Sequence, residues 1–108
     1  MAAPIVIPAH VEQQLIRLYD ILYRQGYFSY KEHAIQYVND IREFIKQIPN
    51  QPKRPLKDKK FGQYFRKYVP NRKTTWFISF KEENGKYLIT YITNNHSDDY
   101  DLFIRAIT

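Results

Sequence analysis

Hydrophobic residues in the first half of the chain recur with the period of an α-helix. Val11, Leu15, Leu18 and Leu22 are spaced by four, three and four residues, which places them on one helix face. A second stripe follows and ends before Pro49, which disfavours helical geometry in the residue before it. The segment between the stripes is short, so the sequence predicts two antiparallel helices. Ile16 and Tyr19 widen the first stripe, and the second contains Ala34, Tyr37, Val38, Ile41, Phe44, Ile45 and Ile48.

Two local patterns predict where these helices end and begin. Ser29 and Glu32 have the spacing of a capping box, in which each side chain bonds to the backbone amide at the other position. Gly26 suits the position just beyond the first helix, where a left-handed backbone ends it. The sequence therefore predicts a helix end near residue 26 and a helix start at residue 29.

The second half of the chain alternates with the period of a β-strand. Residues 64–69, 74–80 and 87–93 predict three strands. Asn84 and Gly85 predict a two-residue type I′ turn between the last two strands. The alternation places Tyr64, Arg66 and Tyr68 on one side of their strand, opposite to Phe65, Lys67 and Val69, and gives Trp76, Ile78 and Phe80 a common face.

One more strand precedes the helices. Residues 5–7 are β-branched and lie between two prolines, which favours a short edge strand. The predicted order is β-α-α-β-β-β, and residues 1–108 are expected to form one α+β domain in which a helix hairpin packs on one face of a small, mainly antiparallel sheet. Residues 49–62 predict a loop, and residues 102–104 predict either a short helix or a docking tail.

The charge of the chain is concentrated in one stretch. The 108 residues carry a formal net charge of +6 and include ten Tyr, seven Phe and one Trp. Residues 53–73 contain nine of the 17 Lys and Arg residues but one acid, Asp58, which gives a local charge of +8 and leaves the rest slightly acidic. Because these like charges repel one another, we expect a polyanionic partner that neutralises them, with nucleic acid the first candidate. We also expect carboxylates, from this chain or from a partner, to cover residues 53–73.

Composition excludes several other classes. The chain has no Cys, which excludes disulfide scaffolds, thiolate zinc sites and cysteine nucleophiles, and its three scattered His residues do not suggest a metal site. Three Gly leave no room for a P-loop or a dinucleotide fingerprint, so no cofactor is expected. No apolar run reaches the roughly 18–20 residues of a membrane span, and no signal peptide is evident. We therefore expect a cytoplasmic protein without membrane contacts.

Basic residues interleaved with aromatic rings are suited to single-stranded nucleic acid. Cations neutralise phosphates, and rings stack on bases for about 1–3 kcal/mol per base. Phe65 and Trp76 are instead expected to fill the core, as large aromatic residues in a small domain usually do. The predicted nucleic-acid-binding residues are Lys57, Lys59, Lys60, Tyr64, Lys67, Arg72 and Lys73.

The element order, the basic loop and three stretches resemble the RelE/ParE superfamily of bacterial toxins. The stretches are residues 60–65 (KFGQYF), 71–78 (NRKTTWFI) and 91–96 (YITNNH), and the resemblance covers nearly the whole chain. It implies a toxin of a type II toxin–antitoxin system, bound by a cognate antitoxin in a hetero-oligomer. RelE-like members cut mRNA in the ribosomal A site, whereas ParE-like members inhibit DNA gyrase and are not nucleases.

Cleavage beside a 2′-hydroxyl requires a proton acceptor, cations that stabilise the phosphate, and an acid for the leaving oxygen, but no metal. The resemblance points to His96, Arg66 and Tyr100 as catalytic residues. The chain departs from the family in two ways. Residues 75–77 offer no Arg where many relatives have one, and Asp98, Asp99 and Asp101 bring negative charge close to His96 and Tyr100.

Three hypotheses therefore stay open at the level of the sequence. The chain is a ribosome-dependent mRNA endonuclease that arrests translation, a ParE-like gyrase inhibitor, or a basic RNA-binding module without toxicity. The first requires catalytic residues, whereas the other two require only binding surfaces.

Overall fold

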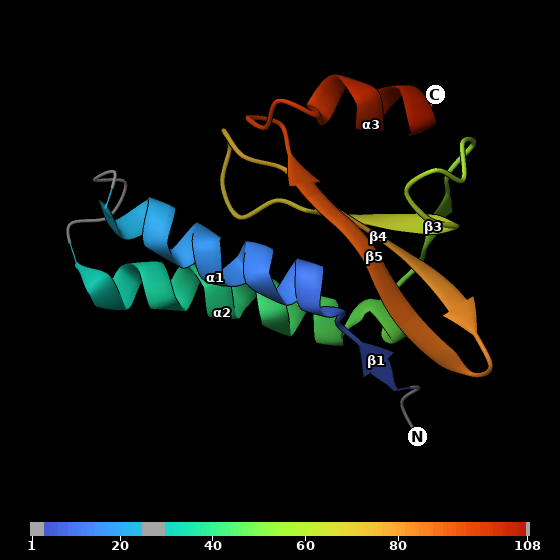
Figure 1. The fold of residues 1–108 in the computed structure, drawn as a ribbon, viewed down its shortest axis with the longest axis horizontal. Helices are drawn as coiled ribbons and strands as arrows, with labels where there is room; N and C mark the ends of the chain where they lie inside the picture. The colour runs from blue at the N-terminus through green and yellow to red at the C-terminus, as the bar shows by residue number, and fades with distance from the viewer. Residues whose placement is uncertain (1–3, 25–29, 108) are drawn as a thin grey trace.

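The computed structural model describes residues 4–24 and 30–107 (Figure 1). In these residues three α-helices and a five-stranded mixed sheet form an α+β fold. None of these helices is long and apolar enough to cross a membrane. The elements are β1 (Ile5–Val6), α1 (Ala9–Arg24), α2 (Lys31–Lys46), a 3-10 turn (Ile48–Asn50), β2 (Arg54–Pro55), β3 (Tyr64–Tyr68), β4 (Trp76–Glu83), β5 (Lys86–Asn94) and α3 (Tyr100–Ile107).

The sheet has the strand order β1-β5-β4-β3-β2. The edge strand β1 runs parallel to β5, and the other neighbours are antiparallel. The predicted α+β class, the edge position of β1 and the mainly antiparallel sheet are confirmed. The turn between β4 and β5 is also as predicted, because Asn84 and Gly85 both have positive φ, at 52° and 76°.

The helices α1 and α2 lie side by side and antiparallel, and together they cover one face of the sheet (Figure 1). We call this face the hairpin side. The predicted stripes form its core, except that Ile16 is 57% exposed and does not widen the stripe of α1. The buried residues at this interface are Val11, Leu15, Val38, Ile41, Ile45 and Ile48 from the helical part and Trp76, Ile78, Phe80, Ile89 and Ile92 from the sheet.

The start of α2 differs from the capping-box prediction. The N-cap residue is Tyr30, whose backbone is extended and whose side chain makes no capping hydrogen bond. The helix thus begins one residue later than a cap at Ser29 would place it, while Ser29 itself and Gly26 lie outside the described residues. At its other end, the amide of Gln47 closes α2 by donating to the carbonyl of Phe44.

The helix α3 covers the opposite face of the sheet, which we call the α3 side (Figure 1). Its Phe103 is fully buried, and ring centroids 5.4 and 6.1 Å away belong to Phe77 and Phe65. The helix alternative for residues 102–104 is therefore confirmed. The prediction did not include a second small core, which α3 builds together with Leu56 on this face.

The predicted loop over residues 49–62 is wrong in part, because much of it is structured. The strand β2 pairs with β3, and the next residue, Leu56, is 1% exposed in the core beneath α3. The amide of Leu56 donates to the carbonyl of Gln63 at 3.0 Å and so closes a loop over residues 56–63, which we call the basic loop. The amides of Lys57 and Asp58 donate to the carbonyl of Ala106, so this loop also holds the end of α3.

A β-bulge interrupts the pairing of β4 with β5. Ser79 pairs with Tyr91, but the next residue, Phe80, pairs with Ile89, so Thr90 is an extra residue in β5. Thr90 and Tyr91 consequently both contact Phe61 of the basic loop, the first through its hydroxyl and the second through its ring. The sequence prediction of a regular strand over residues 87–93 did not include this bulge.

Replacing Gly62 by Ala should destabilise the fold by about 2–3 kcal/mol. Its φ is +155°, and an added Cβ would lie 2.5 Å from the hydroxyl oxygen of Thr90. The matched control is Gly85→Ala, which also has positive φ but meets no atom within 4 Å and should lose about 1 kcal/mol. Urea denaturation measures both, and equal losses would show that the loop does not press on Thr90.

Acidification should weaken the contact between the two helices. An ion pair joins Glu12 of α1 to Arg42 of α2, and this hydrogen bond lowers the pKa of Glu12 below its usual value of 4.5. The pair therefore stabilises the fold above pH 4.5 and is lost as the pH falls through the lowered pKa. We expect wild type to lose up to about 1 kcal/mol more than Glu12→Gln over that range, since both groups are partly exposed. Glu43→Gln is the control, because its partner Lys46 lies on the same helix.

Candidate nucleic-acid interface

Strand alternation places Arg66 and Lys67, two neighbouring basic residues of β3, on opposite sides of the sheet. Arg66 pairs with Ile78 on the hairpin side, where its guanidinium lies 5.6 Å from the ring centroid of Phe44. It donates to the carbonyl of Pro52 and, at 3.1 Å, to the side-chain oxygen of Gln51. Arg66 therefore fastens the segment after α2 to the sheet.

Tyr64, predicted to bind nucleic acid, also lies on the hairpin side. Its ring packs near that of Phe80, with centroids 5.8 Å apart, and the ammonium of Lys53 lies 4.3 Å from its centroid. Lys53 forms an ion pair with Glu82, and this hydrogen bond raises the pKa of the Lys53 ammonium. The charge of Lys53 is thus matched within the chain, and the ring of Tyr64 is packed between core and cation.

The other predicted residues of the sheet gather where β3 and β4 meet the end of β5. Lys67 pairs with Phe77 on the α3 side, and the ring of Tyr100, the first residue of α3, lies 5.8 Å from that of Phe77. The exposed His96 lies beside the turn between β3 and β4, because its Nε2 is 3.2 Å from the hydroxyl of Thr74. We call this group the turn cluster; it comprises Lys67, Arg72, Lys73, His96 and Tyr100.

Two asparagines that were not predicted as site residues hold the turn cluster in place. The side-chain oxygen of Asn71 accepts from the amides of Lys73 and Thr74, which shapes the turn. Asn95 spans the two segments by accepting from the amide of Thr75 and donating to the carbonyl of Lys73, each at 2.9 Å. The dipeptide Asn94-Asn95 at the end of a strand is the sequence signal for such a turn.

The three predicted catalytic residues do not form one cluster. His96 and Tyr100 belong to the turn cluster, whereas Arg66 lies on the hairpin side, across the sheet from Tyr100. Lys67, the next residue of β3, is a basic residue on the same side of the sheet as Tyr100. A phosphate at the turn cluster would therefore meet Lys67 and Lys73 rather than Arg66.

The acidic residues after β5 have different roles from one another. The carboxylate of Asp99 accepts from the hydroxyls of Tyr91 and, at 2.5 Å, Thr93, so it fastens the start of α3 to the sheet. Asp98 and Asp101 are exposed.

Of the nine bases in residues 53–73, Lys53 is the one that pairs with a carboxylate of the described residues. Within the described residues, the prediction that carboxylates cover residues 53–73 is thus met at Lys53 alone.

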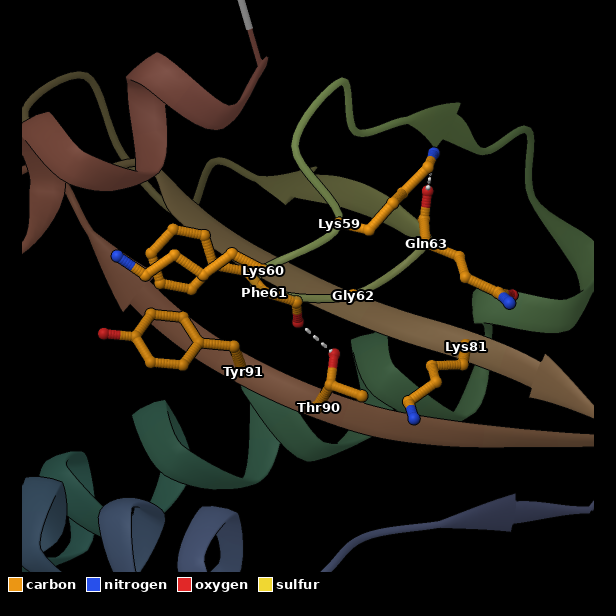
Figure 2. A pocket seen from close by; sticks show the side chains of 8 residues that line it. All are labelled: Lys59, Lys60, Phe61, Gly62, Gln63, Lys81, Thr90 and Tyr91. Carbon is orange, nitrogen blue, oxygen red and sulfur yellow. Dashed lines mark hydrogen bonds between the residues drawn. The ribbon is translucent and has the colours of Figure 1, made fainter.

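A basic cavity of about 460 Å³ opens on the α3 side, between the basic loop and the strands β4 and β5 (Figure 2). Lys59 and Lys60, both predicted to bind nucleic acid, line it together with Lys81 of β4, which the sequence analysis missed. Lys81 follows directly after the predicted strand 74–80, and extending the alternation by one residue would have placed it opposite to Phe80. The full lining is Lys59, Lys60, Phe61, Gly62, Gln63, Lys81, Thr90 and Tyr91.

Hydroxyl groups at the bulge fix the floor of this cavity. The carbonyl of Phe61 accepts from the hydroxyl of Ser79 at 2.9 Å. It also accepts from the hydroxyl of Thr90 at 2.5 Å (Figure 2). The ammonium of Lys59 donates to the carbonyl of Leu56 at 2.6 Å, which ties its charge to the loop. No group of three or more His, Cys, Asp or Glu side chains in residues 4–24 and 30–107 is placed to hold a metal ion.

Replacing Arg66 by Ala should reduce the free energy of unfolding by about 1–2 kcal/mol, because it removes two hydrogen bonds and a cation–π contact. Lys67→Ala is the matched control: this side chain is exposed on the α3 side and its loss should change stability by less than about 0.5 kcal/mol. Chemical denaturation checks both. Undiminished stability of Arg66→Ala would contradict the anchoring role.

Comparison of the chain with protein-family models, with curated proteins and with solved structures gave no significant match.

Proposed function

We propose that the chain is a RelE/ParE-like toxin that binds mRNA on the ribosome and cuts it at the turn cluster. The observation that carries this proposal is the charge on the α3 side of the sheet and along the basic loop. Apart from Lys81, whose ammonium lies 3.8 Å from a carboxylate oxygen of Glu83, its cations make no ion pair with the carboxylates of the described residues. An uncompensated basic surface attracts a polyanion and releases its counterions on binding. These cations are Arg54, Lys57, Lys59, Lys60 and Lys67, and Arg72 and Lys73 extend them to the turn cluster.

The fold supports the same proposal. The observed order of strands and helices contains the β-α-α-β-β-β order that resembles the toxin superfamily, with β2 and α3 added to it. The basic loop and the turn cluster lie at separate positions along one sheet, so a single strand of RNA can meet both. A polynucleotide suits such a surface better than a small substrate does.

The turn cluster has the groups that cleavage beside a 2′-hydroxyl requires. His96 is exposed and takes up the proton of the 2′-hydroxyl, whose oxygen then attacks the phosphorus. Lys67 and Lys73 stabilise the charge of the phosphate. Tyr100 gives a proton to the leaving 5′-oxygen, so the products are a 2′,3′-cyclic phosphate and a 5′-hydroxyl.

Purified protein added to translating ribosomes should cut mRNA at the A site, as mapped by primer extension. His96→Ala should slow the cutting by about 100-fold, because general acid–base catalysis contributes at least that much. Lys31→Ala removes an exposed base on α2, remote from the turn cluster, and should have no effect. Intact mRNA at stoichiometric wild-type protein would contradict the proposal.

One observation favours the ParE-like alternative, in which the chain inhibits gyrase without cutting nucleic acid. Leu15, Ile16, Tyr19 and Ile35 contribute to an apolar groove of about 310 Å³ between α1 and α2, and Ile16 and Ile35 are 57% and 42% exposed. Exposed apolar grooves of this kind commonly bind proteins. Gyrase supercoiling should then stop with wild type and with His96→Ala alike, but continue with Ile16→Gln/Ile35→Gln. Normal supercoiling in the presence of wild type would exclude this alternative.

The proposal includes a cognate antitoxin as partner. The unpaired cations on the α3 side require carboxylates, so the antitoxin segment that covers them is expected to be acidic. If a short open reading frame lies beside the gene, co-expression of its product should suppress toxicity, and the resulting complex should protect the basic loop from chemical modification of its lysines.

A further inference from the structure

The basic cavity is separate from the turn cluster. Lys81 lies five residues along β4 from Trp76, where the turn between β3 and β4 ends, and this corresponds to about 16 Å of strand. The two sites are therefore too far apart to hold the same phosphate. The chemistry proposed for His96 leaves the cavity without a role.

The cavity combines positive charge with aromatic surface. Three lysines line it and no carboxylate does, although the ammonium of Lys81 lies 3.8 Å from a carboxylate oxygen of Glu83 beside the cavity. The rings of Phe61 and Tyr91 lie side by side in one wall, with centroids 4.6 Å apart, and the ammonium of Lys60 is 5.6 Å from the Phe61 centroid (Figure 2). Such a lining suits a ligand that has both an anionic group and a flat ring.

The cavity is held open by contacts that do not involve a ligand. The hydroxyls of Ser79 and Thr90 hold the carbonyl of Phe61, and the side-chain oxygen of Gln63 accepts from the amide of Glu82 at 3.1 Å. Gly62 allows the loop to approach the sheet closely. A site shaped in advance loses less entropy when it binds its ligand.

We infer that this cavity binds one nucleotide unit, with the phosphate between Lys60 and Lys81 and the base against Phe61 and Tyr91. Lys59 adds a fixed positive charge, since its ammonium is tied to the carbonyl of Leu56. The inference rests on the proposed RNA-binding function and deepens it, because it gives the RNA a second contact outside the turn cluster. A free nucleotide and a nucleotide within a single strand offer the same chemistry.

NMR titration tests the inference with adenosine monophosphate, inorganic phosphate and an oligoadenylate as separate probes. Adenosine monophosphate should shift the amide signals of residues 60–62 and 90–91, and inorganic phosphate should bind more weakly because it lacks the ring. In Lys60→Ala/Lys81→Ala the affinity for adenosine monophosphate should fall by at least about fivefold. Lys31→Ala/Lys46→Ala removes two exposed lysines of α2, on the hairpin side, and should bind like wild type.

The oligoadenylate distinguishes the two sources of the nucleotide. If it shifts the same signals and binds more tightly than adenosine monophosphate, the cavity serves a strand of RNA. The salt slope of its affinity should then fall by about 0.7 in Lys60→Ala/Lys81→Ala, for the one phosphate that the two lysines hold. If adenosine monophosphate alone binds there, the cavity still takes a nucleotide, but a free one.

Two results would overturn the inference. One is inorganic phosphate binding as tightly as adenosine monophosphate, which would show that the rings of Phe61 and Tyr91 do not contribute to binding. The other is the absence of shifts at residues 60–62 and 90–91 with every probe. The proposed function is judged separately by mRNA cutting, since nucleotide binding in the cavity can persist in a protein that cuts no RNA, and cutting can persist without it.

Discussion

The β-bulge at Thr90 is the constraint on which the functional side of the molecule depends. In a regular strand Thr90 and Tyr91 would face opposite sides, and the basic loop would have one of them as a neighbour. The extra residue turns both toward Phe61, so one supplies a hydroxyl to its carbonyl and the other a ring to its side chain. The same residue keeps Ile89 and Ile92 together in the core under the hairpin. The loop and the core are thus fixed by a single irregularity.

The remaining contacts on the α3 side follow from this anchorage. Once the basic loop is fixed, its Leu56 fills the space under α3, and its amides at residues 57 and 58 hold the carbonyl of Ala106. Asp99 fastens the other end of α3 through the hydroxyls of Tyr91 and Thr93. The helix α3 is therefore held at both ends by contacts with the residues that also shape the cavity. The basic loop is consequently packed against the rest of the fold.

Local sequence signals predicted the repetitive parts of the fold and failed where distant residues decide. Hydrophobic periodicity predicts the stripes of α1 and α2 and the common side of Tyr64, Arg66 and Tyr68. Turn chemistry predicts the turn at Asn84 and Gly85. No short-range pattern marks Thr90 as a bulge or Pro55 as a strand residue, because both depend on pairing with another segment. The side of the sheet on which Arg66 lies depends on strand pairing in the same way. The sequence pattern allowed Arg66 to be grouped with His96, but the pairing of Arg66 with Ile78 of β4 places it on the hairpin side.

Alternation also explains why the charge remains available on one side of the sheet. Lys53 and Arg66 fall on the hairpin side, where the chain supplies Glu82, a carbonyl and an amide oxygen to receive them. Arg54 and Lys67, one residue further in each strand segment, fall on the α3 side, where Arg54 lies over the ring of Phe65 and neither pairs with a carboxylate of the described residues. Lys53 and Arg66, two of the nine bases in residues 53–73, thus serve the fold. The other seven make no ion pair with a carboxylate of the described residues, and a dense positive surface that the fold does not itself require is what a polyanion-binding protein needs.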